Sequence, residues 1–177
     1  MAESMETMNQ AVKVMAEREG KYLTFILAKE EYGISILKIR EIIGMMPITS
    51  VPQTPEFVKG VINLRGKVIP VIDLRVKFKM AATAYSDRTC IIVVEIQGAA
   101  GHIHMGCVVD AVSEVLNIRS RDIEDTPNFG ANLDASYILG MAKMEGDVKI
   151  LLDINRVLNA DEVSSLDQTA NENYKNH

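Results

Sequence analysis

The side chains best suited to chemistry in this sequence are two histidines and two aspartates. His102 and His104 stand two positions apart on a predicted strand, so they face the same side and with a third ligand would form a metal site. No third ligand stands at metal-binding spacing from them, and we interpret the pair as a polar strand face near the predicted hairpin at 98–101. Asp73 and Asp153 each end a predicted strand, which favours an N-cap or turn over half of a catalytic dyad.

No other motif completes an active site. The sequence has no phosphate-binding loop, dinucleotide fingerprint or nucleophile elbow, and Asp110 is a lone acid after a strand. Cys90 and Cys107 lie inside β-branched apolar runs, which is typical of free buried thiols in a reducing compartment. The sequence therefore predicts no catalytic residues, no metal site and no cofactor.

Charge and hydropathy narrow the class of protein. The formal net charge of −5 and the pI near 5.3 argue against nucleic acid and against an anionic membrane surface, because both need clustered Lys and Arg. No apolar run approaches the ~20 residues that span a bilayer, and the first residues are acidic where a secretory signal would be basic. We expect a folded cytoplasmic protein.

The elements that must position any site come as two copies of one module. The stretch 32–43 matches 105–116 at a spacing of 73 positions, with a glycine and a glutamate aligned in both. Gly60, Gly66, Asp73 and Leu74 match Gly140, Gly146, Asp153 and Ile154 at a spacing of 80, and 54–57 matches 126–129 at 72. The change in spacing predicts an insertion within 130–138. The motifs of the first copy occupy about 21–80 and those of the second about 88–158.

Each copy reads as about five short strands, which predicts a mainly β protein of two small barrels. Hairpin turns are predicted at Arg65-Gly66 and at Gly146-Asp147, and one helical turn at 54–60. Pro70 indicates a strand edge or a bulge, because proline cannot donate to a β ladder. A barrel this small has no internal pocket, so recognition must use an outer face, an edge or the seam between the barrels.

The two ends differ from the repeat. Residues 1–20 are predicted to form a mobile or weakly docked helix, with an apolar stripe formed by Met5, Met8, Val12 and Met15. Asn159 and Glu162 form a capping-box pattern that opens a C-terminal helix over 159–177, with Val163 and Leu166 on its inner side and a polar tail after Gln168.

The motifs at 31–42, 54–66 and 68–75 closely resemble the CheW family of chemotaxis coupling proteins, over about 22–158. The resemblance implies two SH3-like five-stranded barrels with short helices, no enzymatic activity, and an adaptor that couples methyl-accepting chemoreceptor tips to the regulatory domain of the CheA histidine kinase. It also implies other CheW-like domains of array rings as partners, and neither nucleic acid nor membrane insertion. The alternative is a sensor module that holds a small ligand or metal near His102 and His104.

By the same resemblance, partner contacts are expected at Ile36, Ile39, Glu41, Gly60, Arg65 and Val115. Arg65 has a separate argument, because its equivalent in the second copy is Glu145 and the turn therefore does not require arginine. Arginine is also enriched among residues that dominate binding energy at interfaces. The alternatives are a solvated turn charge at Arg65 and a core side chain at Ile39.

Overall fold

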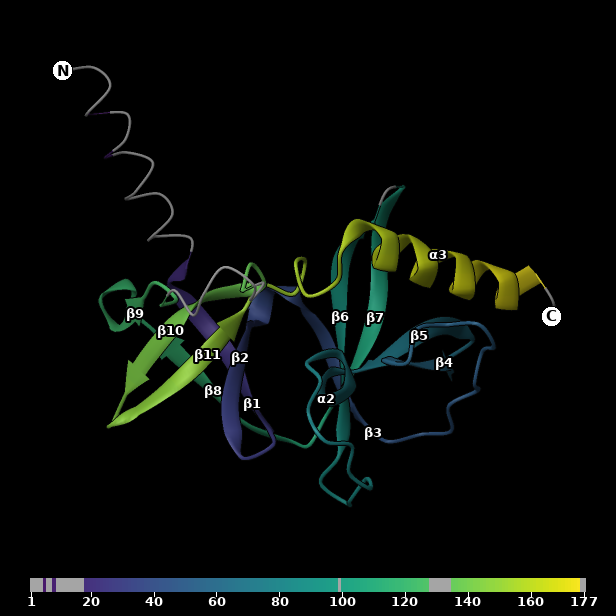
Figure 1. The fold of residues 1–177 in the computed structure, drawn as a ribbon, viewed down its shortest axis with the longest axis horizontal. Helices are drawn as coiled ribbons and strands as arrows, with labels where there is room; N and C mark the ends of the chain where they lie inside the picture. The colour runs from purple at the N-terminus through teal and green to yellow at the C-terminus, as the bar shows by residue number, and fades with distance from the viewer. Residues whose placement is uncertain (1–4, 6–7, 9–17, 99, 128–134, 176–177) are drawn as a thin grey trace.

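Two β-sheets and a C-terminal helix make up the protein (Figure 1). The computed structural model describes residues 5, 8, 18–98, 100–127 and 135–175, with the backbone alone for 168–175. Sheet A contains, in spatial order, β8 (Ala111–Ile118), β1 (Gly20–Leu27), β2 (Glu30–Ser35), β11 (Asp147–Leu152), β10 (Ile138–Met144) and β9 (Ile123–Glu124). Sheet B contains β3 (Ile39–Gly44), β6 (Cys90–Gly98), β7 (Gly101–Val109), β5 (Lys67–Asp73) and β4 (Val58–Leu64). The mainly β, two-part fold predicted from the sequence is confirmed.

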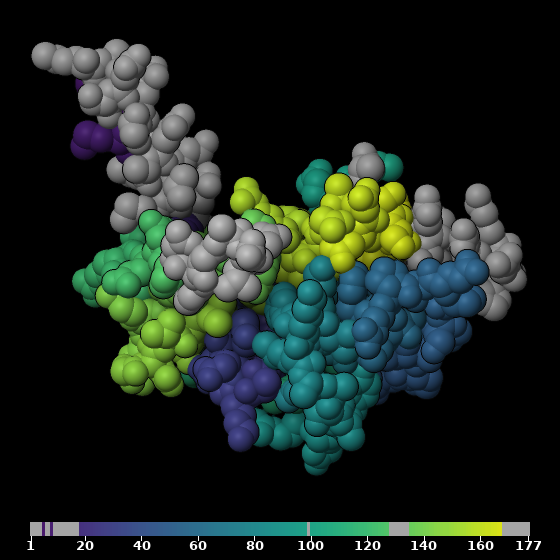
Figure 2. All heavy atoms as spheres, viewed as in Figure 1, coloured from purple at the N-terminus to yellow at the C-terminus, as the bar shows by residue number. Residues whose placement is uncertain are grey.

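Short helices join these strands. They are η1 (Ile36–Lys38), α2 (Leu74–Lys77) and η2 (Ser120–Asp122), and α3 (Ala160–Lys175) closes the chain. Figure 1 shows α3 running across sheet B, and Figure 2 shows the first turns of α3 lying against the atoms of that sheet. No helix among the described residues is both long enough and apolar enough to cross a membrane.

The two sequence copies are interleaved between the sheets. Strands β1 and β2 of the first copy join β8–β11 of the second, while β6 and β7 of the second copy join β3–β5 of the first. Within each sheet one parallel pair of strands joins the two copies. In sheet A this pair is β2–β11, with Gly33 opposite Leu151, and in sheet B it is β7–β5, with Gly106 opposite Val71. The two pairs are equivalent in the repeat, because Gly106 follows Gly33 by 73 positions and Leu151 follows Val71 by 80. The ranges 21–80 and 88–158 therefore delimit copies of the sequence but not the two sheets.

Three apolar layers follow from this arrangement. One cluster lies within sheet A and includes Tyr22 and Leu151, and one lies within sheet B and includes Ile69 and Val93. The largest cluster takes side chains from both sheets and Leu166 from α3, so it fills the space between the sheets. A row of stacked aromatic rings runs through this layer, with centroid separations of 6.0, 6.2 and 5.0 Å along Phe25, Tyr32, Phe78 and Tyr137.

The predicted helical turn at 54–60 is wrong. Pro55 O accepts a hydrogen bond from Val58 N at 3.0 Å, which makes a single turn, and strand β4 starts at Val58. Its structural counterpart is 135–138, where Ala135 O accepts from Ile138 N at 3.0 Å. The match of 54–57 to 126–129 is therefore also wrong, and the extra residues of the second copy lie between Glu124 and Ala135. This interval overlaps the predicted 130–138 only in part.

Two further details concern the predicted hairpin turns and Pro70. The β10–β11 turn is Glu145-Gly146 rather than Gly146-Asp147, whereas the β4–β5 turn at Arg65-Gly66 is confirmed. Pro70 lies on β5, an interior strand, opposite Val61. The backbone of Val61 bonds outward to Thr49, so the Val61–Pro70 pair exchanges no ladder hydrogen bond. Pairing of β5 with β7 starts only at Val71, and the β4–β5 register shifts between Val58 and Gly60, next to the Val61–Pro70 pair, so the proline lies beside an irregularity of the bulge type on an interior strand.

The predicted caps are confirmed. Asn159 Oδ1 accepts from Glu162 N at 2.8 Å, and Glu162 Oε1 accepts from Asn159 N at 2.9 Å. Asp73 and Asp153 each accept a hydrogen bond from the backbone N–H two residues on, at 2.9 and 3.1 Å. Both cysteines are free, and burial raises the pKa of Cys107 to about 12.

The predicted methionine stripe near the start of the chain is described only at Met5 and Met8, which are largely exposed. Val12 and Met15 lie outside the described residues.

Candidate partner-binding site

An ion pair joins the β4–β5 turn of sheet B to β3, an edge strand of the same sheet. The order β3-β6-β7-β5-β4 leaves β3 and β4 at the edges, and the β4–β5 turn carries Arg65 back to β3. There the Arg65 Nη2 donates to Glu41 Oε1, and the hydrogen bond to this carboxylate raises the pKa of Arg65. The Arg65 side chain remains 71% exposed. The structure therefore brings together two of the predicted contact residues, and a partner has direct access to the guanidinium.

Beside this pair lies a second chain of polar contacts. Arg40 donates to Glu95, whose other oxygen lies 3.5 Å from His104 Nε2, and Lys67 Nζ lies 2.8 Å from His104 Nδ1. The hydrogen bond from Arg40 lowers the pKa of Glu95 in spite of partial desolvation. Residues from both sets of contacts line one hollow of about 250 Å³, formed by Arg40, Glu41, Leu64, Arg65, Lys67, Ile69, Val93 and His104.

This site is suited to binding protein rather than to catalysis. Three cationic side chains, Arg40, Arg65 and Lys67, line the hollow with one carboxylate, Glu41, so guanidinium and ammonium donors remain for partner carboxylates or carbonyls. Lys67 beside His104 places a positive charge where a metal ion would bind. Among the described residues no group of three or more His, Cys, Asp or Glu has the arrangement of a metal site.

A second, apolar surface lies where the chain crosses from sheet A to sheet B. The crossing is η1, in which Ile36 is 38% exposed and Leu37 is 90% exposed. Ile39 follows this helix, is partly buried and packs against the apolar layer between the sheets. The structure therefore supports the alternative that Ile39 is a core side chain. Leu37 was missed by the sequence analysis because an exposed leucine and a core leucine look alike in a short strand-rich pattern.

Val115 lies on the other sheet. It is 48% exposed on β8, the edge of sheet A, and pairs with Leu23 of β1. Its equivalent in the repeat, Ile42, is 46% exposed on β3, the edge of sheet B. Ile42 was also missed, although the spacing of 73 positions offered the signal.

Gly60 has a packing role. Its φ is +142°, and a Cβ on it would lie 2.0 Å from the carbonyl oxygen of Thr49. The absence of a side chain lets the Thr49 segment pair with Val61 along β4.

The CheW-like domain family matches residues 21–162. The chain belongs to the CheW family. It is 40% identical over 159 residues to the chemotaxis protein CheW of Klebsiella aerogenes, covering 89% of this chain and 93% of the relative. It is 32% identical over 155 residues to the chemotaxis protein CheW of Rhizobium meliloti, covering 88% and 97%.

A solved structure supports the same assignment. The scaffolding protein TtCheW from Thermoanaerobacter tengcongensis superposes with a TM-score of 0.71 at 37% sequence identity, over 81% of this chain and 95% of that one. The CheW family is a family of chemotaxis scaffold proteins, so partner binding at the surface is the relevant chemistry.

Within this CheW fold the two copies differ at the site. The turn residues Arg65 and Glu145 share a left-handed backbone, with φ of 52° and 49°. Glu41 corresponds to Glu114 at the spacing of 73, so two carboxylates in sheet A replace the ion pair of sheet B. The fold therefore accepts either set of charges, and the ion pair is a property of one copy only.

Proposed function

We propose that this protein is a cytoplasmic, non-enzymatic adaptor of chemotaxis that couples methyl-accepting chemoreceptors to the CheA histidine kinase. The observation that carries the proposal is the presence of two chemically different exposed surfaces on one two-sheet body. One is the charged site around Arg65 and Glu41, and the other is the apolar crossing at Ile36 and Leu37. An adaptor needs two such surfaces because it must bind two partners at once.

The charged site is assigned to the regulatory domain of the kinase. An exposed arginine held by a neighbouring carboxylate presents its remaining donors in a fixed orientation, which favours directional recognition of a folded partner. Other CheW-like domains of an array ring would use the same surface chemistry.

The apolar crossing is assigned to the receptor tip. An exposed leucine and isoleucine between two sheets suit the apolar face of a helical hairpin, which buries such side chains at regular spacing. Val115 and Ile42 extend this apolar character to the edge strands. The alternative of a sensor module has less support, because the hollow of about 160 Å³ next to His102 and His104 also holds Lys67.

Binding measured separately to each partner tests the proposal. Isothermal titration would use the whole protein against the kinase regulatory domain and against a receptor cytoplasmic hairpin. Arg65→Glu should weaken kinase-domain binding about 30-fold, the effect of losing one interface hot spot, and leave receptor binding intact. Leu37→Asp should do the reverse.

Two variants serve as matched controls. Glu145→Gln alters the equivalent turn of sheet A, and Val148→Asp alters an exposed apolar residue, 51% exposed on β11. Neither should change binding to either partner by more than about twofold, within the range of ordinary surface substitutions. Absence of binding by the unmodified protein to both partners would contradict the proposed function.

A further inference from the structure

The chain crosses between the two sheets at two places that the repeat makes equivalent. It passes from sheet A to sheet B through η1, and returns through one residue, Asp110, between β7 and β8. Asp110 corresponds to Leu37 at the spacing of 73 positions. One crossing therefore carries a carboxylate where the other carries an exposed leucine.

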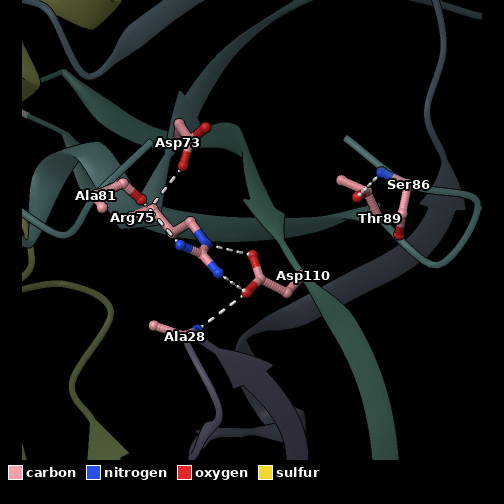
Figure 3. A network of polar contacts seen from close by, with 7 residues as sticks. All are labelled: Ala28, Asp73, Arg75, Ala81, Ser86, Thr89 and Asp110. Carbon is pink, nitrogen blue, oxygen red and sulfur yellow. Dashed lines mark hydrogen bonds and ion pairs between the residues drawn. The ribbon is translucent and has the colours of Figure 1, made fainter. Parts of the chain in front are cut away.

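Asp110 is held from both sides (Figure 3). Its carboxylate accepts from Arg75 Nε at 2.7 Å and from Arg75 Nη2 at 2.6 Å, and also from the backbone N–H of Ala28 at 2.9 Å. Arg75 belongs to α2, directly after β5 of sheet B, whereas Ala28 lies in the β1–β2 turn of sheet A. The carboxylate thus connects one sheet to the other.

The surrounding contacts fix the arginine as well. Its Nη1 donates to the carbonyl of Ala81 at 2.8 Å, and its backbone N–H donates to the Asp73 cap. The side chains of Arg75 and Asp110 are only 17% and 25% exposed. A two-pronged contact between planar groups in this setting restricts orientation more than a single hydrogen bond does.

The equivalent place at the other crossing is built differently. Asn155 corresponds to Arg75 at the spacing of 80, and its Oδ1 accepts directly from Gln97 N at 3.0 Å. This is one neutral hydrogen bond at the surface, and the residue equivalent to Asp110 points its apolar side chain to solvent. The two crossings therefore differ in the number and in the charge of the contacts that connect the sheets there.

From this contrast we propose that Arg75 and Asp110 are positioning residues that fix the angle between the two sheets and thereby set the spacing of the contact residues on them. The exposed apolar residues assigned to the receptor are divided between the sheets, with Ile42 on β3 and Val115 on β8. The binding of a partner that touches both edge strands therefore depends on the angle between the sheets. The consequence for binding rests on the proposed function, whereas the effect on the angle does not.

The test compares variants of this contact with a matched control. Arg75→Lys keeps the charge and loses the two-pronged geometry, and Asp110→Asn keeps an acceptor for Ala28 and loses the charge. The control is Lys77→Met, which removes an ion pair of similar exposure, 20% and 17%, between Lys77 and Glu162. That pair ties α2 to α3 and does not bridge the two sheets.

Residual dipolar couplings of the backbone N–H groups give the relative orientation of the sheets in solution. One alignment frame should fit both sheets in the unmodified protein and in Lys77→Met, and fail to fit both in Arg75→Lys and Asp110→Asn. Binding to the receptor hairpin should fall about tenfold in these two variants, equivalent to 1.4 kcal/mol, and less than twofold in Lys77→Met.

Each outcome has a distinct meaning. Unchanged sheet orientation in both Arg75→Lys and Asp110→Asn would overturn the inference. An equal loss of binding in Lys77→Met would also overturn it, because stability rather than position would then be responsible. If the unmodified protein bound no receptor, the proposed function would fail, and the dipolar couplings alone would decide the positioning role.

Discussion

Substituting Gly60 by alanine separates a packing role from a partner contact. The new Cβ would lie 2.0 Å from the oxygen and 2.7 Å from the carbon of the Thr49 carbonyl, and 3.0 Å from the Cα of Ser50. All three atoms belong to the backbone, so no side-chain rotation relieves the clash. The Thr49 segment must move away from β4, which breaks its two hydrogen bonds with Val61 at 2.8 and 2.9 Å.

The expected loss of stability follows from these contacts. Two lost hydrogen bonds cost about 1 kcal/mol each. Forcing alanine into a backbone with φ of +142° adds about 1–3 kcal/mol. A total of about 3–5 kcal/mol corresponds to a fall in melting temperature of roughly 10 °C for a chain of this length.

Gly66→Ala is the control. Its φ is +86° and no atom lies within 4 Å of the added Cβ, so only the conformational cost of about 1 kcal/mol applies. Calorimetry should show a melting temperature about 2–4 °C lower. Kinase-domain binding, measured well below the melting transition, should be preserved in both variants. A Gly60→Ala protein that melts like the unmodified chain but no longer binds would refute this reasoning and make Gly60 a contact residue.

Three further predictions concern charges and caps. The double substitution Glu41→Arg/Arg65→Glu exchanges the two charges and restores the ion pair. The melting temperature should therefore match that of the unmodified protein, while binding to the kinase domain should stay weak. Recovery of binding would show that the pair acts only by joining the β4–β5 turn to β3. Burial opposes ionisation of Asp110, but the hydrogen bonds from Arg75 and Ala28 and the Arg75 charge lower its pKa below the ordinary 3.8. The stabilising effect of the Asp110 carboxylate is therefore complete above pH ~4 and lost as the pH falls through the lowered pKa. In urea titrations, the difference in unfolding free energy between the unmodified protein and Asp110→Asn should become smaller in acid. A difference that does not change with pH would contradict this. Asn159→Ala should cost about 1 kcal/mol in urea unfolding through loss of the capping box, with Asn159→Asp close to neutral; equal stability of both would mean that the cap contributes nothing.

Several local features were readable from the sequence, although the turns at 54–60 and 146–147 were not, and long-range pairing was not readable at all. The capping box at Asn159, the caps at Asp73 and Asp153 and the Arg65-Gly66 turn depend on residues close in the chain, and all were predicted. The interleaving of the copies depends on parallel pairs such as Gly33 with Leu151, which lie far apart in the sequence. Strand periodicity gives the face of each side chain but not the neighbour of each strand.

The candidate site shows the same division. Arg65 and Glu41 were each predicted, but their ion pair requires the β4–β5 turn to reach β3, which depends on the order of five strands. Leu37 was missed because its exposure depends on the crossing between sheets rather than on its neighbours in the chain.

The most direct test of the adaptor role is co-sedimentation of the kinase with receptor-containing membranes, in the presence and absence of this protein. Receptor cytoplasmic domains anchored on vesicles, the full-length histidine kinase and the unmodified chain would be mixed, and the pelleted kinase measured. We predict that the kinase pellets with the vesicles only when this chain is added, and that Arg65→Glu leaves this chain on the vesicles while the kinase stays in solution. Equal pelleting of the kinase with and without the chain would contradict the account.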